Sequence, residues 1–411
     1  MKAPTKTARV RKDRTVVILG AGMVGSVIAA DLAGDRHLRI TVADRSPQSL
    51  ERARSRAGGR VAAVEADLSD RRTVARLIAD ADLVVGALPS VFGFAALESV
   101  VDAGLPYCDI SFMPEDFLVL SKRAKRTGSV CVADCGVAPG MSNMLAAWCA
   151  AKLDRTERID IMVGGVPRDR HWPFEYKAGF SPGDVIEEYV RPSRVVERGR
   201  IVVKEALSEP ELIDFPGVGT LEAFNTDGLR SLATTLTVPF MRERTMRYPG
   251  HIELMRVFRE TGLFSLEPIE VGGVAVRPRD LLARLLFPKW TYAEGEADLT
   301  VMRVLAEGTL DGVATRITWD LLDRADPQTG FSSMSRTTAF PCTSVVRMLL
   351  DGTIRTAGVH APEHIVGMPG VFDRIMRDMK ERGVAYAARV EQLEDAQPDR
   401  RRRAPSRSAK R

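Results

Sequence analysis

The first 135 residues alternate between short apolar runs and segments with helical spacing. Six apolar runs, from "TVVIL" at 15–19 to "SVCVA" at 129–133, are separated by stretches in which apolar positions recur every three or four residues. Apolar strands that alternate with amphipathic helices are typical of a parallel sheet covered by helices on both faces. The pattern predicts an α/β fold for residues 15–151, with a doubly wound parallel sheet of the Rossmann type.

The pattern changes near residue 152. Longer strand-like runs appear, among them "RIDIMVGGV" at 158–166 and the pair 291–308 and 313–323, which flank the turn sequence "TLDG". Two such runs joined by a short glycine-containing connection indicate a β-hairpin. These features predict an α+β domain with an antiparallel or mixed sheet over residues 152–332. A helix is then expected from about Ser333, despite Pro341 in its interior.

Composition is that of an ordinary globular protein. The chain has 411 residues, of which 45% are hydrophobic and 27% charged, and no apolar run approaches the roughly 20 residues of a membrane helix. The basic N-terminus lacks the apolar segment of a secretory signal. Five cysteines, an odd number, lie mostly in apolar runs, which favours reduced, buried thiols and a cytoplasmic location.

The net charge of +5 is unevenly placed. Residues 1–14 carry +5 and residues 397–411 carry +6, which leaves −6 for the rest of the chain. We expect residues 1–14 and 391–411 to be basic disordered tails. Because the remainder is acidic, it offers no basic face for nucleic acid, and no specific nucleic-acid partner is expected.

The first chemical motif is "GAGMVG", which ends a strand and opens a helix. This position lets the glycines form a tight turn and lets the helix N-terminus receive a pyrophosphate. Asp44 ends the next strand, where a carboxylate would hold the adenosine ribose. Its charge favours NAD over NADP, while Arg45 beside it keeps NADP as the alternative. The motif assigns dinucleotide binding to Gly20, Gly22, Met23, Val24, Gly25, Asp44 and Arg45.

Three later loops should meet the same crevice, because ligands lie beyond the carboxyl ends of parallel strands. "GALPS" contributes Ala87, Leu88 and Pro89, and "CGVAPG" contributes Val137, Ala138 and Pro139 on the side nearest the nicotinamide. Asp109 follows another strand and faces the same place. Asp67 either contacts adenine or belongs to a helix-capping turn.

Other chemistries have weak support. His360 and His364 have i, i+4 spacing, but Pro362 between them disfavours the helix that a metal site would use. Cys131 and Cys135 also fail as a metal pair, and no metal is expected. No Ser-His-Asp or P-loop pattern is visible.

A series of motifs in order resembles the saccharopine dehydrogenase (glutamate-forming) superfamily, in particular its lysine 6-dehydrogenase branch. The motifs are the Rossmann opening, "DCGVAPGMSN", "FSPGDVIEEY", "EAFNTDG", "TMRYPG" and "GVHAPE", over about residues 15–385. The resemblance implies that residues 152–332 are an inserted domain that binds substrate and forms a homodimer. It implies that residues 333–390 return to the Rossmann domain, and that the reaction is NAD(P)-linked oxidation of a C–N bond.

One departure from that pattern bears on the substrate. Saccharopine reductases usually carry Asn-Arg-Asp-Ser where this chain has Asn-Thr-Asp-Gly at 225–228. Loss of an arginine argues for fewer carboxylates on the substrate, which favours lysine. Arg230 and Arg247 remain as carboxylate anchors, unless either one belongs to an ion pair at the domain interface. The substrate-binding candidates are therefore Asp109, Thr226, Asp227, Arg230 and Arg247.

Catalytic candidates come from "HWPFEYKAGFSPGD" at 171–184. Glu175, Tyr176 and Lys177 could meet the substrate amine, and His171 is a further possible base. The expected reaction is oxidation of the ε-amine of lysine to a semialdehyde that cyclises. Two alternatives stay open: a saccharopine-type or other ω-amino-acid dehydrogenase, and a non-enzymatic NAD-binding scaffold.

Overall fold

The structure is a computed structural model, and it describes residues 13–393. Seven strands form one fully parallel sheet. In sheet order they are β17 (Gly358–His360), β6 (Val130–Val132), β5 (Tyr107–Asp109), β4 (Leu83–Gly86), β1 (Arg14–Leu19), β2 (Leu38–Asp44) and β3 (Val61–Glu65). The six strands predicted from residues 15–133 are all present, and β17 is an additional strand from the C-terminal part.

Both faces of this sheet are buried, which explains the continuous apolar strands. In β1, Val16 and Ile18 enter one core cluster while Val17 and Leu19 enter another. The first cluster is covered by α1 (Met23–Leu32), α2 (Pro47–Arg56) and α11 (Ser333–Leu350). The second is covered by α3 (Arg71–Ile78), α4 (Ser90–Asp102), the 3₁₀ helix η1 (Phe117–Leu120) and α5 (Ser121–Thr127).

A second sheet is mixed, as the changed pattern after residue 152 predicts. Its main path is β10 (Glu211–Phe215), β11 (Gly219–Asn225), β12 (Phe240–Arg247), β7 (Arg155–Pro167), β15 (Asp298–Leu310), β16 (Val313–Arg324) and β18 (Tyr386–Gln392). β8 (Ser193–Glu197) pairs with β12 and with β9 (Arg200–Lys204). Because Leu310 pairs with Val313, the hairpin expected at "TLDG" is confirmed.

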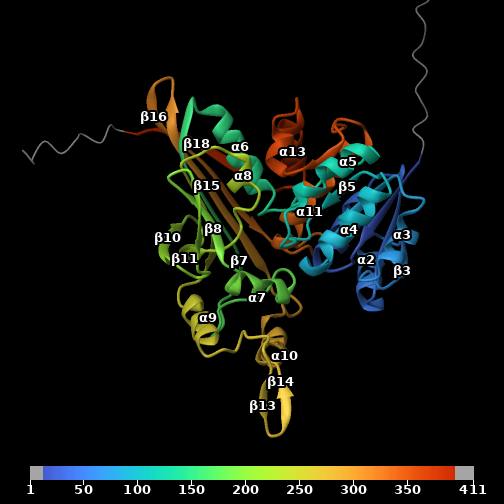
Figure 1. Ribbon diagram of the computed structural model, residues 1–411, viewed down its shortest axis with the longest axis horizontal. Helices are drawn as coiled ribbons and strands as arrows, with labels where there is room; N and C mark the ends of the chain where they lie inside the picture. Colours follow the sequence, from blue (N-terminus) through green and yellow to red (C-terminus); the bar gives the residue numbers. More distant parts are fainter. Residues whose placement is uncertain (1–12, 394–411) are drawn as a thin grey trace, which may run out of the picture.

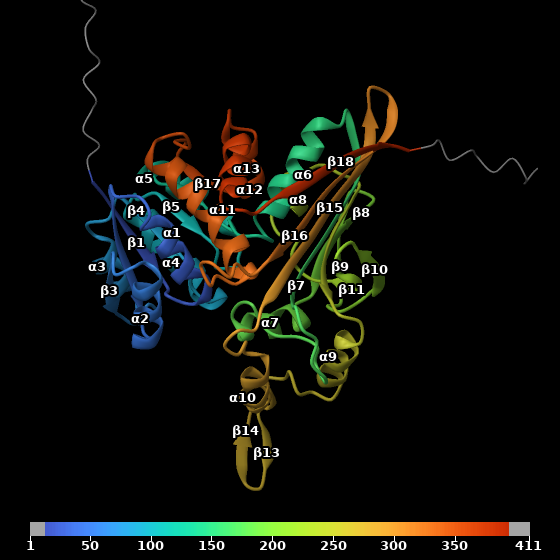
Figure 2. The ribbon, with the colours of Figure 1, turned by 180° about the vertical axis from the view of Figure 1, so that it is seen from behind.

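The two sheets share a core. α6 (Met141–Lys152) and α11 lie between them, and one cluster runs from Val16 of β1 through Met144 to Val304 of β15 (Figures 1 and 2). The remaining helices are α7 (Pro182–Val190), α8 (Leu232–Thr235), α9 (His251–Glu260), α10 (Pro278–Trp290), α12 (Pro362–Val366) and α13 (Val371–Glu381). α10 and the hairpin of β13 (Ile269–Val271) and β14 (Val274–Val276) project from the body.

The ends of the chain differ in detail from expectation. Arg14, placed by sequence in a tail, begins β1. β18 pairs antiparallel with β16, so the end of the segment expected to return to the Rossmann part extends the mixed sheet instead. Glu391 and Gln392, also expected in a tail, belong to this edge strand. The rest of both basic tails, 1–12 and 394–411, lies outside the described residues.

The structure also bears on membrane-spanning helices and on the state of the cysteines. Between residues 13 and 393, no helix has the length and apolar character needed to cross a membrane. All five cysteines are free and buried, as their apolar surroundings predict.

Candidate active site

The glycine loop after β1 touches the loop after β4, at the point where the strand order reverses. Gly20 has φ +107°, and a Cβ there would lie 2.2 Å from the carbonyl oxygen of Ala87. Ala87 N in turn donates to the carbonyl of Leu19. Only glycine allows this approach, so the local sequence fixes the two loops side by side at the usual ligand crevice of such a sheet.

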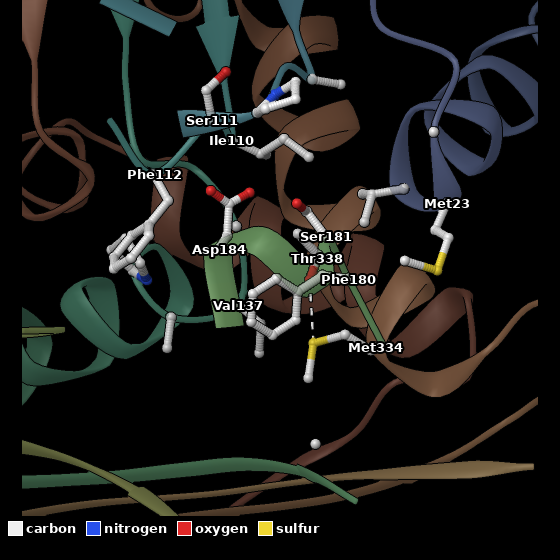
Figure 3. A pocket seen from close by; sticks show the side chains of 18 of the residues that line it. Met23, Ile110, Ser111, Phe112, Val137, Phe180, Ser181, Asp184, Met334 and Thr338 are labelled. Atoms are coloured by element: carbon white, nitrogen blue, oxygen red, sulfur yellow. Dashed lines mark hydrogen bonds between the residues drawn. The ribbon is translucent and has the colours of Figure 1, made fainter. Parts of the chain in front are cut away.

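A cleft of about 360 Å³ opens from these loops toward the mixed sheet. In Figure 3 the ring of Phe180 lies among Val137, Met334 and Thr338. The residues that line the cleft come from both parts of the chain. They are 22–25, 87–89, 110–112, 136–139, 163–165 and 180–181, with Arg52, Asp134, Asp184, Glu188, Thr245, Arg247, Met334 and Thr338.

Most of the predicted cofactor residues line this cleft. They are Gly22, Met23, Val24, Gly25, Ala87, Leu88, Pro89, Val137, Ala138 and Pro139. Asp44 lies outside the lining; its Oδ2 accepts from Ala21 N and its Oδ1 from Ser46 N, each at 2.8 Å. Asp44 therefore lies at the end of β2 directly behind the glycine loop, and its contact with the ribose stays a prediction.

Two other predicted cofactor residues lie farther away. Arg45 is exposed beside Asp44. Asp67 is exposed, and its Oδ1 accepts from the backbone N and Oγ of Ser69. Asp70 caps α3, so the "DLSD" stretch forms the capping turn weighed above. An adenine contact by Asp67 stays a prediction.

The "CGVAPG" loop folds back on itself at the rim of the cleft. Gly136 N donates to the Pro139 carbonyl at 3.0 Å, and Asn143 Oδ1 accepts from Gly140 N at 3.2 Å. Gly140 has φ +136°, and a Cβ there would lie 2.0 Å from the Gly136 oxygen. The loop therefore presents Val137, Ala138 and Pro139 to the cleft, as predicted.

Asp109 supports the cleft from behind. It is fully buried and accepts hydrogen bonds from Tyr107 Oη at 2.8 Å and Ser111 Oγ at 2.6 Å. Ser111 Oγ accepts from Leu88 N at 3.3 Å. Burial raises the pKa of Asp109 to about 6. The structure thus places Asp109 outside the lining, where it orients Ser111, rather than in the substrate-facing position expected.

Arg247 is the buried cation of the cleft wall. Its Nη2 donates to Glu188 Oε2 at 2.9 Å, its Nη1 to the Met246 carbonyl, and its guanidinium lies 4.7 Å from the centre of the Tyr176 ring. Its Nε is buried with no hydrogen-bond partner among the described residues. The guanidinium lines the cleft, where its charge suits a substrate carboxylate.

Two carboxylates of α7, Asp184 and Glu188, share the lining with Arg247. Burial raises the pKa of Glu188, while the charge of Arg247 lowers it. Asp184 accepts from Ser90 Oγ at 2.6 Å. Arg247 therefore lies with two acidic side chains from α7. The lining also contains Arg52 and Asp134, and Asp134 is paired with Arg230.

The other predicted substrate residues are engaged elsewhere. Arg230 is buried and donates to Asp134 at 2.9 Å and to the Met113 carbonyl, and it does not line the cleft. Asp227 pairs with Arg194 at 2.9 Å. Thr226 is buried beside Thr245. Arg230 is thus an ion-pair partner across the two parts of the chain and not a free carboxylate anchor.

The predicted catalytic group is not brought to the cleft. Glu175 pairs with Arg170 and Lys177 with Glu296. Tyr176 is buried against His251 and Trp290, and burial raises its pKa well above the usual value. His171 is exposed. None of these side chains lines the cleft. The part of the segment 171–184 that does so is its end, at Phe180, Ser181 and Asp184.

The residues that sequence reasoning missed follow immediately in the chain. Phe180 and Ser181 precede α7, and Asp184 and Glu188 lie on it at i, i+4 spacing. Two acids one helical turn apart share a face, which is the signal that could have identified them. Met334 and Thr338 on α11 follow the same spacing.

Both parts of the chain match the models of known protein families. Residues 16–132 match the family model of the saccharopine dehydrogenase NADP binding domain, and residues 136–384 match the saccharopine dehydrogenase C-terminal domain. The chain is 21% identical to saccharopine dehydrogenase [NADP(+), L-glutamate-forming] of Schizosaccharomyces pombe, over 89% of this chain and 97% of the relative.

Two further relatives extend the comparison. The bovine mitochondrial alpha-aminoadipic semialdehyde synthase is 22% identical over 91% of this chain, which spans 47% of that longer protein. The solved apo saccharopine dehydrogenase (L-Glu forming) of Saccharomyces cerevisiae superimposes with a TM-score of 0.75 at 19% identity, over 92% of this chain and all of that one. Two consecutive family domains that together cover residues 16–384 show that the chain belongs to the saccharopine dehydrogenase family.

Proposed function

We propose that this chain is an NAD(P)-dependent oxidoreductase that oxidises a C–N bond of a lysine-derived amino acid, with saccharopine as the first candidate. The match to the glutamate-forming saccharopine dehydrogenases, over nearly their full length, supports this reaction class. The observation that carries the proposal is the cleft itself, in which the dinucleotide loops face Arg247, Asp184 and Glu188.

The residues at one end of the cleft fit a dinucleotide. The N-terminus of α1 has no side-chain cap and no acid in its first turn, and a Cβ on Gly22 would meet nothing within 4 Å. Open backbone N–H groups at a helix N-terminus suit phosphates. When bound, a nicotinamide supplies a hydride acceptor. The rim at Val137, Ala138 and Pro139 would hold it next to the substrate.

The choice between NAD and NADP rests on Asp44. Its carboxylate lies behind the glycine loop with both oxygens held by backbone N–H groups, so a 2′-phosphate nearby would meet a fixed negative charge. We therefore propose a preference for NAD. The family model and the fungal relatives bear NADP in their names, and exposed Arg45 offers a cation for a 2′-phosphate.

The chain's own residues would bind and orient the substrate. The guanidinium of Arg247 binds a substrate carboxylate, while the ion pair with Glu188 holds the guanidinium in place. Asp184 and Glu188 attract substrate ammonium groups. A substrate amine must lose a proton before its lone pair can form the C=N bond, and a lysine ε-amine has a pKa of about 10.4.

Free lysine is the second candidate, and the charges of the wall favour it. Lysine has one carboxylate and two amines, which corresponds to Arg247 and the two acids of α7, Asp184 and Glu188. Saccharopine has three carboxylates. Thr226, which stands where saccharopine reductases usually have arginine, is buried in the wall behind Thr245 and supplies no cation.

Steady-state assays with saccharopine and with lysine, each with NAD⁺ and NADP⁺, separate the candidates. Both predict that deuterium at C6 of the lysyl chain is transferred to the reduced cofactor and that deuterium at C2 is not. Glutamate as a product identifies saccharopine, and ammonia identifies lysine. Transfer of the C2 label would contradict both. Inactivity with all four combinations would refute the proposal.

We also propose a homodimer and a cytoplasmic location. Most apolar residues of β15 and β16 are buried within the chain. Exposed apolar side chains gather instead on the projecting arm, at Ile269, Val271 and Val274 of the hairpin and Leu281 and Leu285 of α10. This arm is the surface we expect a second copy to cover.

A further inference from the structure

Strand β12 presents three functional groups on one face. Glu243, Thr245 and Arg247 alternate along "RERTMR", and alternate residues of a strand share a face. Thr245 and Arg247 line the cleft, whereas Glu243 lies outside the lining with 2% of its surface exposed. The strand therefore leads from the cleft to a buried carboxyl group.

Hydrogen bonds connect that carboxyl group to the cleft. Thr226 Oγ1 donates to Glu243 Oε2 at 2.7 Å, and Thr226 Oγ1 lies 2.8 Å from Thr245 Oγ1. Gly228 N also donates to Glu243 Oε2, at 3.0 Å. A Cβ on Gly228 would lie 2.2 Å from the Glu243 carboxyl carbon, so glycine allows the backbone to approach. Two hydroxyls thus bridge Glu243 and the cleft wall.

The surroundings of Glu243 are unusual for a carboxylate. No cationic side chain within residues 13–393 forms an ion pair with it, and paired β7 places Ile161 opposite. The nearby charges are Glu188 of α7 and Asp227, which is itself paired with Arg194. Burial raises the pKa of Glu243 to about 8, helped by those two carboxylates and opposed by hydrogen bonds from Thr226 and Gly228.

A buried acid that lacks a cation costs stability and often marks a function. Glu188, the acid that lines the cleft, is held in an ion pair with Arg247, so protonating it would weaken the proposed carboxylate anchor. Glu243 has no such second task. Among residues 13–393, the hydrogen bonds to its carboxyl group come from Gly228 N and from the Thr226 hydroxyl, which leads to the cleft.

We propose that Thr245, Thr226 and Glu243 form a proton relay between the cleft and a buried acceptor, a proposal that rests on the proposed C–N oxidation. The substrate nitrogen gives its proton to Thr245 Oγ1, the Thr245 proton passes to Thr226 Oγ1, and the Thr226 proton passes to Glu243 Oε2. One N–H and two O–H bonds break, and three O–H bonds form. The ammonium and the carboxylate each become neutral. The reverse transfer returns the proton to nitrogen when the C–N bond is cleaved.

The decisive variants are Glu243→Gln, Thr226→Val and Thr226→Ser, with Glu211→Gln as the control. Glu211 is half-exposed and pairs with Arg244, whose side chain points to the other face of β12. We expect kcat in the oxidative direction to fall by about 100-fold in Glu243→Gln and Thr226→Val, within the range for loss of acid–base catalysis. Thr226→Ser should retain most activity, and dinucleotide Kd should not change.

The pH profile separates a relay from a structural role. Oxidation by the wild-type chain should rise through an apparent pKa near 8, as Glu243 ionises, and Glu243→Gln should lose that limb. A solvent deuterium isotope effect carried by several protons should decrease in Thr226→Val. A wild-type kcat and a wild-type pH profile in Glu243→Gln or in Thr226→Val would overturn the relay. If Glu243→Gln does not fold, the Thr226 pair still decides.

A measurement without substrate distinguishes this proposal from the proposed function. Infrared spectra of the substrate-free protein should show a carboxylic C=O band that titrates near pH 8 and is absent in Glu243→Gln. Absence of the band in the wild type would overturn the relay. Inactivity toward both substrates, with the band present, would refute the C–N oxidation, and the relay with it.

Discussion

Replacing Glu243 by glutamine should change how the stability of the folded chain depends on pH. In the folded state burial raises the pKa of this carboxyl group from 4.5 to about 8. Between these values the unfolded carboxyl group is ionised while the folded one keeps its proton. The unfolded state therefore binds fewer protons, and stability falls as pH rises through this interval. The stability that protonated Glu243 retains, relative to ionised Glu243, is complete below pH 4.5 and is lost by about pH 8.

The magnitude follows from the width of that interval. About 3.5 pH units at 1.36 kcal/mol per unit correspond to about 5 kcal/mol. Glutamine does not titrate, so the free energy of unfolding of Glu243→Gln relative to wild type should increase by about this amount between pH 4.5 and 8.5. Urea denaturation at several pH values measures the difference, with Glu211→Gln as the control. Parallel curves for wild type and Glu243→Gln would refute the reasoning.

Three further predictions follow from the site and the projecting arm. Arg247→Gln should raise KM about 10- to 100-fold by removing a charged hydrogen bond to the substrate carboxylate; an unchanged KM would contradict the anchor. Calorimetry should show that NAD binds about 10- to 100-fold more tightly than NADP, and Asp44→Asn should reduce this difference in affinity. Equal affinities of the wild type for NAD and NADP would contradict the proposal that Asp44 selects NAD. Light scattering at micromolar concentration should give a dimer that Leu285→Glu dissociates, whereas a wild-type monomer would contradict the arm interface.

The Rossmann part of the fold was largely predictable from the sequence because its constraints are local. β1 buries alternate residues on both faces, so it reads as an unbroken apolar run. β17 has only three residues, and its pairing with β6, more than two hundred residues earlier, carries no local signal. β18 is an edge strand with mostly exposed residues, so its sequence carries no apolar run to reveal it, and its last two residues were assigned to a tail.

In the candidate site too, local features were predictable from the sequence and long-range contacts were not. The loops at Gly20 and Gly140 were identified because a side chain there would collide with backbone, and only glycine satisfies that condition. The acids of α7 were missed because the i, i+4 spacing of Asp184 and Glu188 does not show what their face of the helix meets. For Arg230 the sequence left a carboxylate anchor and an interface ion pair open, because its partner, Asp134, lies 96 residues away in sequence.

The chain passes between its two sheets three times within the described residues. It crosses where α6 leads into β7, again between β16 and α11 at 325–332, and last between α13 and β18 at 382–385. All three crossings connect the two bodies that form the cleft. A hinge motion that opens the cleft must therefore bend three backbone segments together, so we expect small sliding of α6 and α11 rather than wide domain opening. Substrate would then enter and leave through a passage of nearly constant width.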